Sequence, residues 1–129
     1  MSRNLQPRQF YNKMSDKYDV GMSVSPETFG LQQASVGDGV RRTPVEPHEV
    51  DVPISQVRAR QGYVYDKHVQ NLATVPQSSF HEIHAVPSVS AHHNGTYLLN
   101  EGHHRAAAAI VRGDDTLRVQ VTGRWDPSQ

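Results

Sequence analysis

The sequence predicts a small α/β domain of the α+β type, with a β-α-β-β-α-β core behind an N-terminal arm. Three observations predict it. Apolar and polar residues alternate at both ends of the segment 50–123, as in half-buried strands. The pair Asn94-Gly95 lies between two strand-like runs and is a strong signal for a hairpin. Four consecutive alanines at 106–109 lie in a helical segment that Gly113 is well placed to end.

The composition of the 129 residues fits one modest domain, because only 36% of them are hydrophobic. No apolar run approaches the ~20 residues that a membrane-spanning helix needs, so we expect no membrane partner. The chain has no cysteine. This excludes disulfides, thiolate nucleophiles and cysteine-ligated zinc, and it fits a cytoplasmic protein.

The charge of the chain is balanced, with 13 Lys and Arg against 13 Asp and Glu. A protein that binds DNA through a broad electrostatic surface normally has a basic excess. Any contact with nucleic acid is therefore expected to be a local site or to depend on a partner. The eight histidines add positive charge only below about pH 6.5.

Residues 1–49 are predicted to form the N-terminal arm, which is partly irregular. The stretch 8–18 is expected to make one short helix, and the Pro-containing stretch 43–47 an extended linker. A helix this short is not stable alone in water. We therefore expect the arm to dock on the domain, on another protein or on a second copy of the chain.

The domain is expected to cover residues 50–123, followed by a polar tail at 124–129. Its first strand, at 50–54, contains Pro53, which lacks a backbone donor and therefore indicates an edge strand. A short helix at 67–74 follows, with its apolar residues on one face.

Three further strands and a second helix complete the core. A strand within 83–92 and a return strand at 96–99 form the predicted hairpin. The second helix, at about 104–112, crosses from the third strand to the last one, at 117–121. Trp125 in the tail is expected to be a satellite packing residue.

The turn that enters this second helix carries the residues for chemistry. The first turn of a helix presents unpaired N–H groups and a partial positive charge, and Gly102 lets an anion approach that backbone. Arg105 can grip two phosphate oxygens. His103 and His104 can donate hydrogen bonds or exchange protons, and Glu101 can hold a metal ion or orient a histidine. The alternative is an ordinary helix start whose arginine pairs with a carboxylate.

Further candidates lie outside this turn. Arg58 and Arg60 share one face of an extended chain, and the alternative for them is a solvent-exposed pair in a loop. His81 and His84 could share a metal ion on a helix, but on a strand they would point to opposite faces. A solvated loop is the alternative for this segment.

The segment 50–123 resembles the ParB-like/sulfiredoxin superfamily, whose members are often labelled ParB-like nuclease domains. The shared outline is a strand with a proline, an arginine-bearing loop (here 58–60), a short helix and a second proline-containing strand. A hairpin, a Gly-x-x-Arg turn, a small-residue helix and a last strand follow. The turn here is Gly102-His103-His104-Arg105. The resemblance covers more than half of the chain.

Departures from the branches of this superfamily narrow what the resemblance implies. Sulfiredoxins have a catalytic cysteine where this chain has His103, so their chemistry is excluded. Partition-type ParB proteins carry Gly-Glu-Arg-Arg-x-Arg-Ala, of which only Gly102, Arg105 and Ala108 match, and their helix-turn-helix domain is missing. A chromosome-partitioning clamp is therefore not expected. Related free-serine kinases carry Asp-Gly-His-His-Arg, with Asp in place of Glu101.

The branch that these departures leave is the ParB-like nuclease group. Resemblance to it implies a protein that binds phosphate groups of DNA or a nucleotide, as a metal-dependent phosphodiesterase or nuclease using Mg²⁺ or Mn²⁺. The residues that would hold phosphate are Gly102, His103, His104, Arg105, Arg58 and Arg60. Catalytic roles would fall to Glu101, His103 and His104, and metal ligation to Glu101 and His84. The alternative is a non-catalytic, nucleotide- or DNA-responsive regulatory or structural module of a phage or plasmid. Either protein would work in the cytoplasm of a bacterial or phage-infected cell.

Overall fold

The computed structural model describes residues 19–37, 39–81 and 86–127, and its fold belongs to the α+β class, as the sequence predicts. Its main sheet has five strands in the order β2-β7-β5-β6-β3. In chain order these are β2 (Val40–Pro53), β3 (Val57–Arg58), β5 (Ser88–His92), β6 (Tyr97–Glu101) and β7 (Thr116–Pro127). A second sheet pairs β1 (Ser23–Val24) with β4 (Val64–Tyr65).

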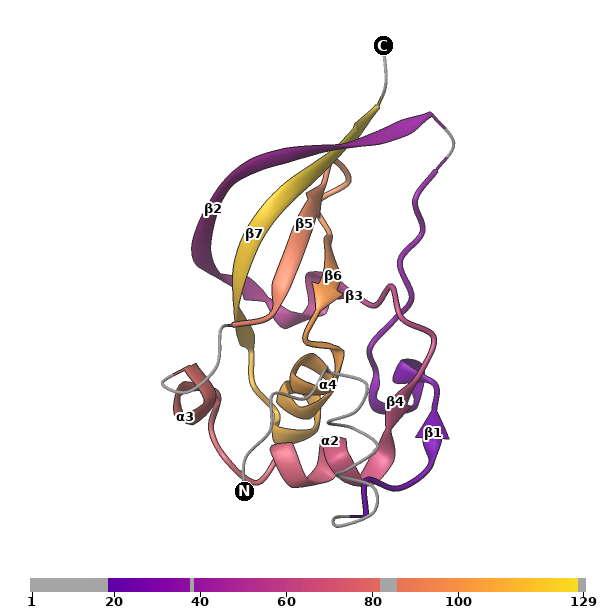
Figure 1. Ribbon diagram of the computed structural model, residues 1–129, viewed down its shortest axis with the longest axis vertical. Coiled ribbons are helices and arrows are strands. Elements are labelled where there is room, and N and C mark those ends of the chain that lie inside the picture. The colour runs from indigo at the N-terminus through magenta and orange to yellow at the C-terminus, as the bar shows by residue number, and fades with distance from the viewer. Residues whose placement is uncertain (1–18, 38, 82–85, 128–129) are drawn as a thin grey trace, which may run out of the picture.

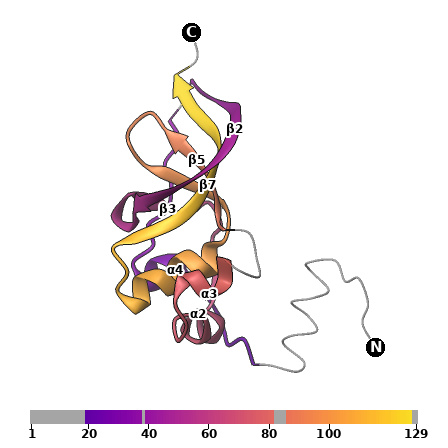
Figure 2. The ribbon, with the colours of Figure 1, turned by 90° about the vertical axis from the view of Figure 1, so that its left-hand side faces the viewer.

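The helices gather at one end of the main sheet (Figure 1). They are α2 (Asp66–Leu72), α3 (Gln77–His81) and α4 (His103–Arg112), with short 3-10 helices η1 (Pro26–Phe29) and η2 (Ile54–Gln56). Figure 2 shows the same arrangement from the side, with the strands above and the helices below. Within the described residues, no helix is both long and apolar enough to cross a membrane.

Strand β2 begins at Val40, so the domain boundary predicted at Val50 falls inside a strand. The stretch 43–47, expected to be a linker, lies within this strand: Thr43 and Pro44 pair with β7, and after an irregularity the pairing resumes at His48. Because β2 has a neighbour on one side only, the missing N–H groups of its prolines are tolerated. The pattern identified the extended backbone, and the strand partner lies some 80 residues further along the chain.

Both ends of the predicted domain therefore extend further than expected. Strand β7 continues to Pro127 and takes in most of the segment predicted as a polar tail. On the N-terminal side, Leu31 is fully buried, and Gln33 forms a parallel bridge with Ala59 beside β3. The described part of the arm thus packs on the domain, whereas the helix expected at 8–18 lies outside the described residues.

The core lies between the main sheet and α4, and its packing follows from small residues. All four alanines at 106–109 are buried and belong to one cluster with Val89, Val119 and Leu99 of the sheet. An alanine face lets a helix lie close to a sheet, because no long side chain separates their backbones. The predicted helices at 67–74 and 104–112 are thereby confirmed within a residue or two at each end.

The connection through α4 places its first turn at the end of the sheet. Strand β5 is antiparallel to β6 and parallel to β7. The C-terminal end of β6 and the N-terminal end of β7 therefore lie at the same end of the sheet. Helix α4 passes the end of β5 between them, as the predicted crossing requires. The predicted hairpin is also confirmed, since β5 and β6 are antiparallel and Gly95 has φ 92°.

Gly102 is constrained twice, which generates a stability prediction. Its φ is 93°, and a Cβ built there would lie 2.5 Å from the Cβ of Pro87. Gly95 has nearly the same φ but no atom within 4 Å of such a Cβ. We expect Gly102→Ala to lower the free energy of unfolding by about 2–4 kcal/mol, and the matched Gly95→Ala by about 1 kcal/mol. Urea denaturation measures the free energy of unfolding of both variants. Equal losses would show that the clash with Pro87 does not contribute to the destabilisation.

Candidate functional site

The candidate site is the turn between β6 and α4. No side chain caps the first turn of this helix. Gly102 is the N-cap residue, in the left-handed conformation. The first turn contains no acidic residue. Sequence reasoning assigned Gly102 to close approach by an anion, and this stays a prediction; the structure shows that Pro87 occupies the space that a Cβ at Gly102 would need. The positive end of the α4 dipole therefore has no acidic side chain within its own first turn.

His103 points into the protein. Its side chain is buried, and its Nε2 accepts the backbone N–H groups of Arg60, at 3.0 Å, and of Gln61, at 3.1 Å. An imidazole that accepts at Nε2 carries its proton on Nδ1. Burial, helped by the nearby charge of Arg60, lowers the pKa of His103 from 6.5 to about 4.

His104 makes an equivalent contact one position later. Its Nε2 accepts the backbone N–H of Tyr65 at 3.0 Å, and its ring stacks on that of Tyr65. His68 meets the same imidazole edge-on, with 4.8 Å between the ring centroids. Burial lowers the pKa of His104 to about 4, helped by the charges of His68 and His103.

The two imidazoles therefore connect the start of α4 to the segment 60–65. They accept three backbone N–H groups there, those of Arg60, Gln61 and Tyr65. Proton transfer at either Nε2 would require these bonds to break. The geometry gives both histidines an anchoring contact rather than an open ligand position at that nitrogen.

The three arginines proposed for phosphate take different positions. Arg105 lies in the first turn of α4 and is half-buried. The backbone of Arg60 is held against the same turn by His103, while its guanidinium lies over the Trp125 ring, 5.2 Å from the centroid. Arg58 donates to the carbonyl oxygens of Ser55 and Val57, so it stays beside its own backbone.

Of the two residues proposed for a metal ion, the structure describes only Glu101. Glu101 is exposed at the end of β6 and pairs in register with Ser88. His84 lies outside the described residues. In the part of the chain that the structure describes, no group of three or more His, Asp or Glu side chains could hold a metal ion.

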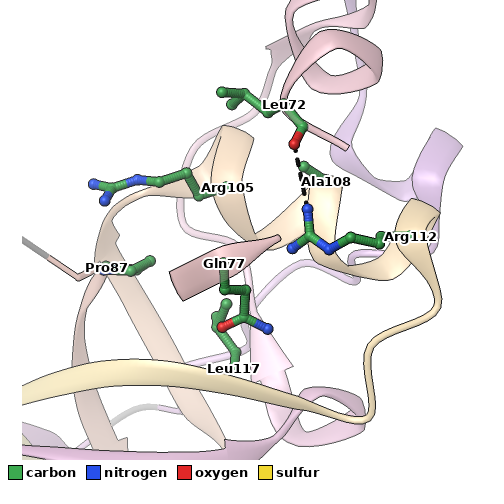
Figure 3. A pocket seen from close by; sticks show the side chains of 7 residues that line it. All are labelled: Leu72, Gln77, Pro87, Arg105, Ala108, Arg112 and Leu117. Carbon is green, nitrogen blue, oxygen red and sulfur yellow. Dashed lines mark hydrogen bonds between the residues drawn. The ribbon is translucent and has the colours of Figure 1, made fainter. Parts of the chain in front are cut away.

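A shallow pocket with a volume of about 10 Å³ opens to solvent beside this turn, among α3, α4 and the start of β7 (Figure 3). Most of its polar lining is already hydrogen-bonded. Arg112 pairs with Asp114 and donates to the carbonyl oxygen of Leu72, and the amide of Gln77 donates to Asp114 and to the carbonyl of Thr116. Arg105 reaches to the Pro87 side of the pocket (Figure 3). No sequence pattern singled out Gln77 or Arg112, because their partners lie in other elements.

In comparisons with known proteins, no family model, no curated protein and no solved structure matches the chain.

The buried imidazoles predict a pH dependence of stability. The pKa values of His103 and His104 are about 4 in the folded chain and 6.5 without the fold. Between these pH values the unfolded chain binds more protons. The contribution of the two neutral imidazoles to the free energy of unfolding is therefore fully present above pH 6.5. It falls as the pH decreases toward 4, by up to about 1.4 kcal/mol per pH unit for each histidine. Urea denaturation from about pH 7.5 to about pH 5 measures this slope, above the range in which carboxylates titrate.

Two variants separate these histidines from the others. His103→Gln keeps an acceptor oxygen but does not titrate, so we expect it to remove about a third to a half of the slope; the rest comes from His104 and from His68, whose pKa burial also lowers. His93→Gln changes an exposed histidine in the hairpin and should leave the slope unchanged. A slope in His103→Gln as steep as in the parent protein would contradict the buried, neutral state of this imidazole.

Proposed function

We propose that this chain is a ParB-like phosphate-binding module, which holds a phosphate group of DNA or of a nucleotide at the start of α4 without cleaving it. The observation that carries the proposal is the first turn of α4. This turn has no side-chain cap and no acidic residue, and it contains Arg105. A helix N-terminus with an arginine in its first turn favours an anion through both its backbone N–H groups and its charge.

The order of elements supports the ParB-like part of the proposal. The structure contains a strand that ends in Pro53, an arginine-bearing segment at 58–60, the helix α2, a proline before β5, the hairpin, and the turn into α4. These elements follow one another in the order of that outline, with Pro87 before β5 rather than within it, and this order supports the proposal.

The contacts of the histidines favour binding over cleavage. General acid–base catalysis needs a group within hydrogen-bond reach of the substrate and with a pKa near the working pH. The acceptor nitrogens of His103 and His104 are bonded to backbone N–H groups, and their pKa values of about 4 lie well below neutrality. Of the two functions inferred from the sequence, the non-catalytic module is therefore the better supported.

The balanced charge of the chain fits a ligand held at one point. With 13 positive and 13 negative side chains, there is no net basic charge to attract a long stretch of DNA. Binding through one or two phosphates depends only weakly on salt, because few counterions are released.

Replacing Arg105 tests the proposal. We expect Arg105→Ala to weaken binding about tenfold, because a charge-assisted bidentate contact is lost. Calorimetry with CTP and ATP and fluorescence anisotropy with single- and double-stranded oligonucleotides measure the affinity. Arg41→Ala is the matched control: Arg41 is exposed and pairs in register with Asp126, near the end of β7 rather than at its start, where α4 lies. Circular dichroism establishes that both variants are folded.

The outcome that would contradict phosphate binding at α4 is equal affinity in the parent and in Arg105→Ala, or no binding of any of these ligands. The non-catalytic part has its own test. Turnover of a nucleotide or oligonucleotide by the parent in Mg²⁺ or Mn²⁺, lost in Glu101→Gln, would establish the nuclease or hydrolase alternative in its place.

A further inference from the structure

The side of the main sheet that faces away from α4 is lined by polar and cationic side chains. On β5, Val89 faces the alanines of α4, so the alternation of the strand sends Ser90 and His92 to the other side. An irregularity in the pairing of β5 with β7 brings Trp125 to that side as well, opposite His92. We call this side the polar face; the residues used below are Arg42, Ser90, His92, Asn100, Thr122 and Trp125.

Arg42 on β2 is the central cation of the polar face. Its Nε donates to Ser90 Oγ at 2.9 Å and its Nη2 to Thr122 Oγ1 at 3.2 Å. The amide of Asn100 donates to the same two hydroxyl groups. Ser90 is fully buried and Arg42 is half-buried.

In the part of the chain that the structure describes, no carboxylate forms an ion pair with Arg42. Arg112, Arg118 and Arg124, in contrast, each form an ion pair. A partly buried guanidinium that meets only neutral hydroxyl groups keeps an uncompensated positive charge, and burying such a charge is unfavourable.

Two buried hydrogen-bond donors lie beside Arg42. The Nδ1 of His92 accepts the backbone N–H of Asn94 at 3.1 Å, which leaves the ring proton on Nε2. This Nε2 and the indole Nε1 of Trp125 are both buried and have no hydrogen-bond partner in the described part of the chain. His92 itself is only 7% exposed. Buried donors without acceptors are rare in native proteins and each calls for a physical reason.

The strand register brings these groups together. Trp125 is paired with Arg42 on β2 and with His92 on β5, so the three side chains lie next to one another across three strands. The guanidinium of Arg60 adds a second cation over the Trp125 ring. The cluster therefore contains two positive charges and two unused donors, and what it lacks is an acceptor with negative charge.

We propose that the polar face is a second anion site, which binds an oxyanion of the phosphate class beside Trp125. Arg42 and Arg60 supply its positive charge, and His92 Nε2–H and Trp125 Nε1–H donate hydrogen bonds to it. A tetrahedral phosphate offers acceptors in several directions, which suits donors that come from three strands and from the end of β3. This site is separate from the turn at α4 and stands on different residues.

Trp125 makes the test direct, because it is the only tryptophan in the chain. Its indole N–H gives a single signal in a ¹⁵N-correlated NMR spectrum, and that proton is one of the proposed donors. We expect titration with inorganic phosphate to shift this signal saturably. Arg42→Gln should weaken the binding about tenfold, because it removes the central charge.

Two further variants control for folding and for charge. Arg60→Gln changes an exposed side chain, so the fold should be retained, and it should also weaken binding. Arg124→Gln removes the same charge one position from Trp125, but Arg124 pairs with Asp126 on the opposite side of the sheet, so the affinity should stay within about twofold. Arg105→Ala should leave the indole response intact even if binding at α4 is lost.

Three probes distinguish the sources of the phosphate group. Saturation by inorganic phosphate or ATP at lower concentration than by a single-stranded oligonucleotide indicates a free phosphate or nucleotide, and the reverse order indicates a nucleic-acid backbone. The proposal is overturned if none of the probes shifts the indole signal saturably, or if acetate does so as well as phosphate. It is also overturned if Arg42→Gln and Arg60→Gln bind like the parent, or if Arg105→Ala abolishes the response.

Discussion

The structure depends on a contact between two side chains at the start of α4 and the backbone of the segment 60–65. This segment runs from the end of β3 through β4, and its backbone N–H groups need acceptors. The imidazoles of His103 and His104 accept three of these N–H groups, so the helix holds the segment together with the short pairing of β4 with β1. Arg60 is carried on this segment, and its position over Trp125 follows from the same contact. The neutrality of both rings is part of the arrangement, since an acceptor nitrogen cannot carry a proton.

Small residues make that contact possible. Because the alanines of α4 let the helix lie directly on the sheet, its first turn comes close enough for two short side chains to reach the neighbouring backbone. Gly102 works in the same direction, since any side chain there would collide with Pro87 at the start of β5. The turn that resembles a phosphate loop is thus also a tightly packed junction between a helix, a strand and a loop.

The sequence predicts those features that depend on neighbours along the chain. The hairpin follows from Asn94-Gly95 and the helix α4 from its alanines, because both signals are local. The full length of β2 depends on β7, and a repeating pattern names no partner. The direction of His103 was beyond reach for the same reason: its hydrogen-bond partners lie 43 and 42 positions away, and adjacent residues on a helix face directions about 100° apart. Trp125 is expected from the sequence to be a packing residue, because a polar segment follows it and its two strand neighbours, Arg42 and His92, lie 83 and 33 positions away.

Net charge proves a weaker guide to anion sites in this chain than the pairing of individual charges. The totals of 13 and 13 suggest full compensation, yet the compensation is uneven in space. Arg112 and Arg124 each pair with a carboxylate two residues further along the chain, and Arg118 pairs with one on the neighbouring strand β2. Arg42 instead donates to two hydroxyl groups. The pairing is not one to one either, since Arg118 contacts both Glu49 and Asp51. Glu101, exposed beside the α4 turn, has no ion-pair partner among the described residues. The local imbalance, rather than the total, is what distinguishes the polar face from an ordinary solvated sheet surface.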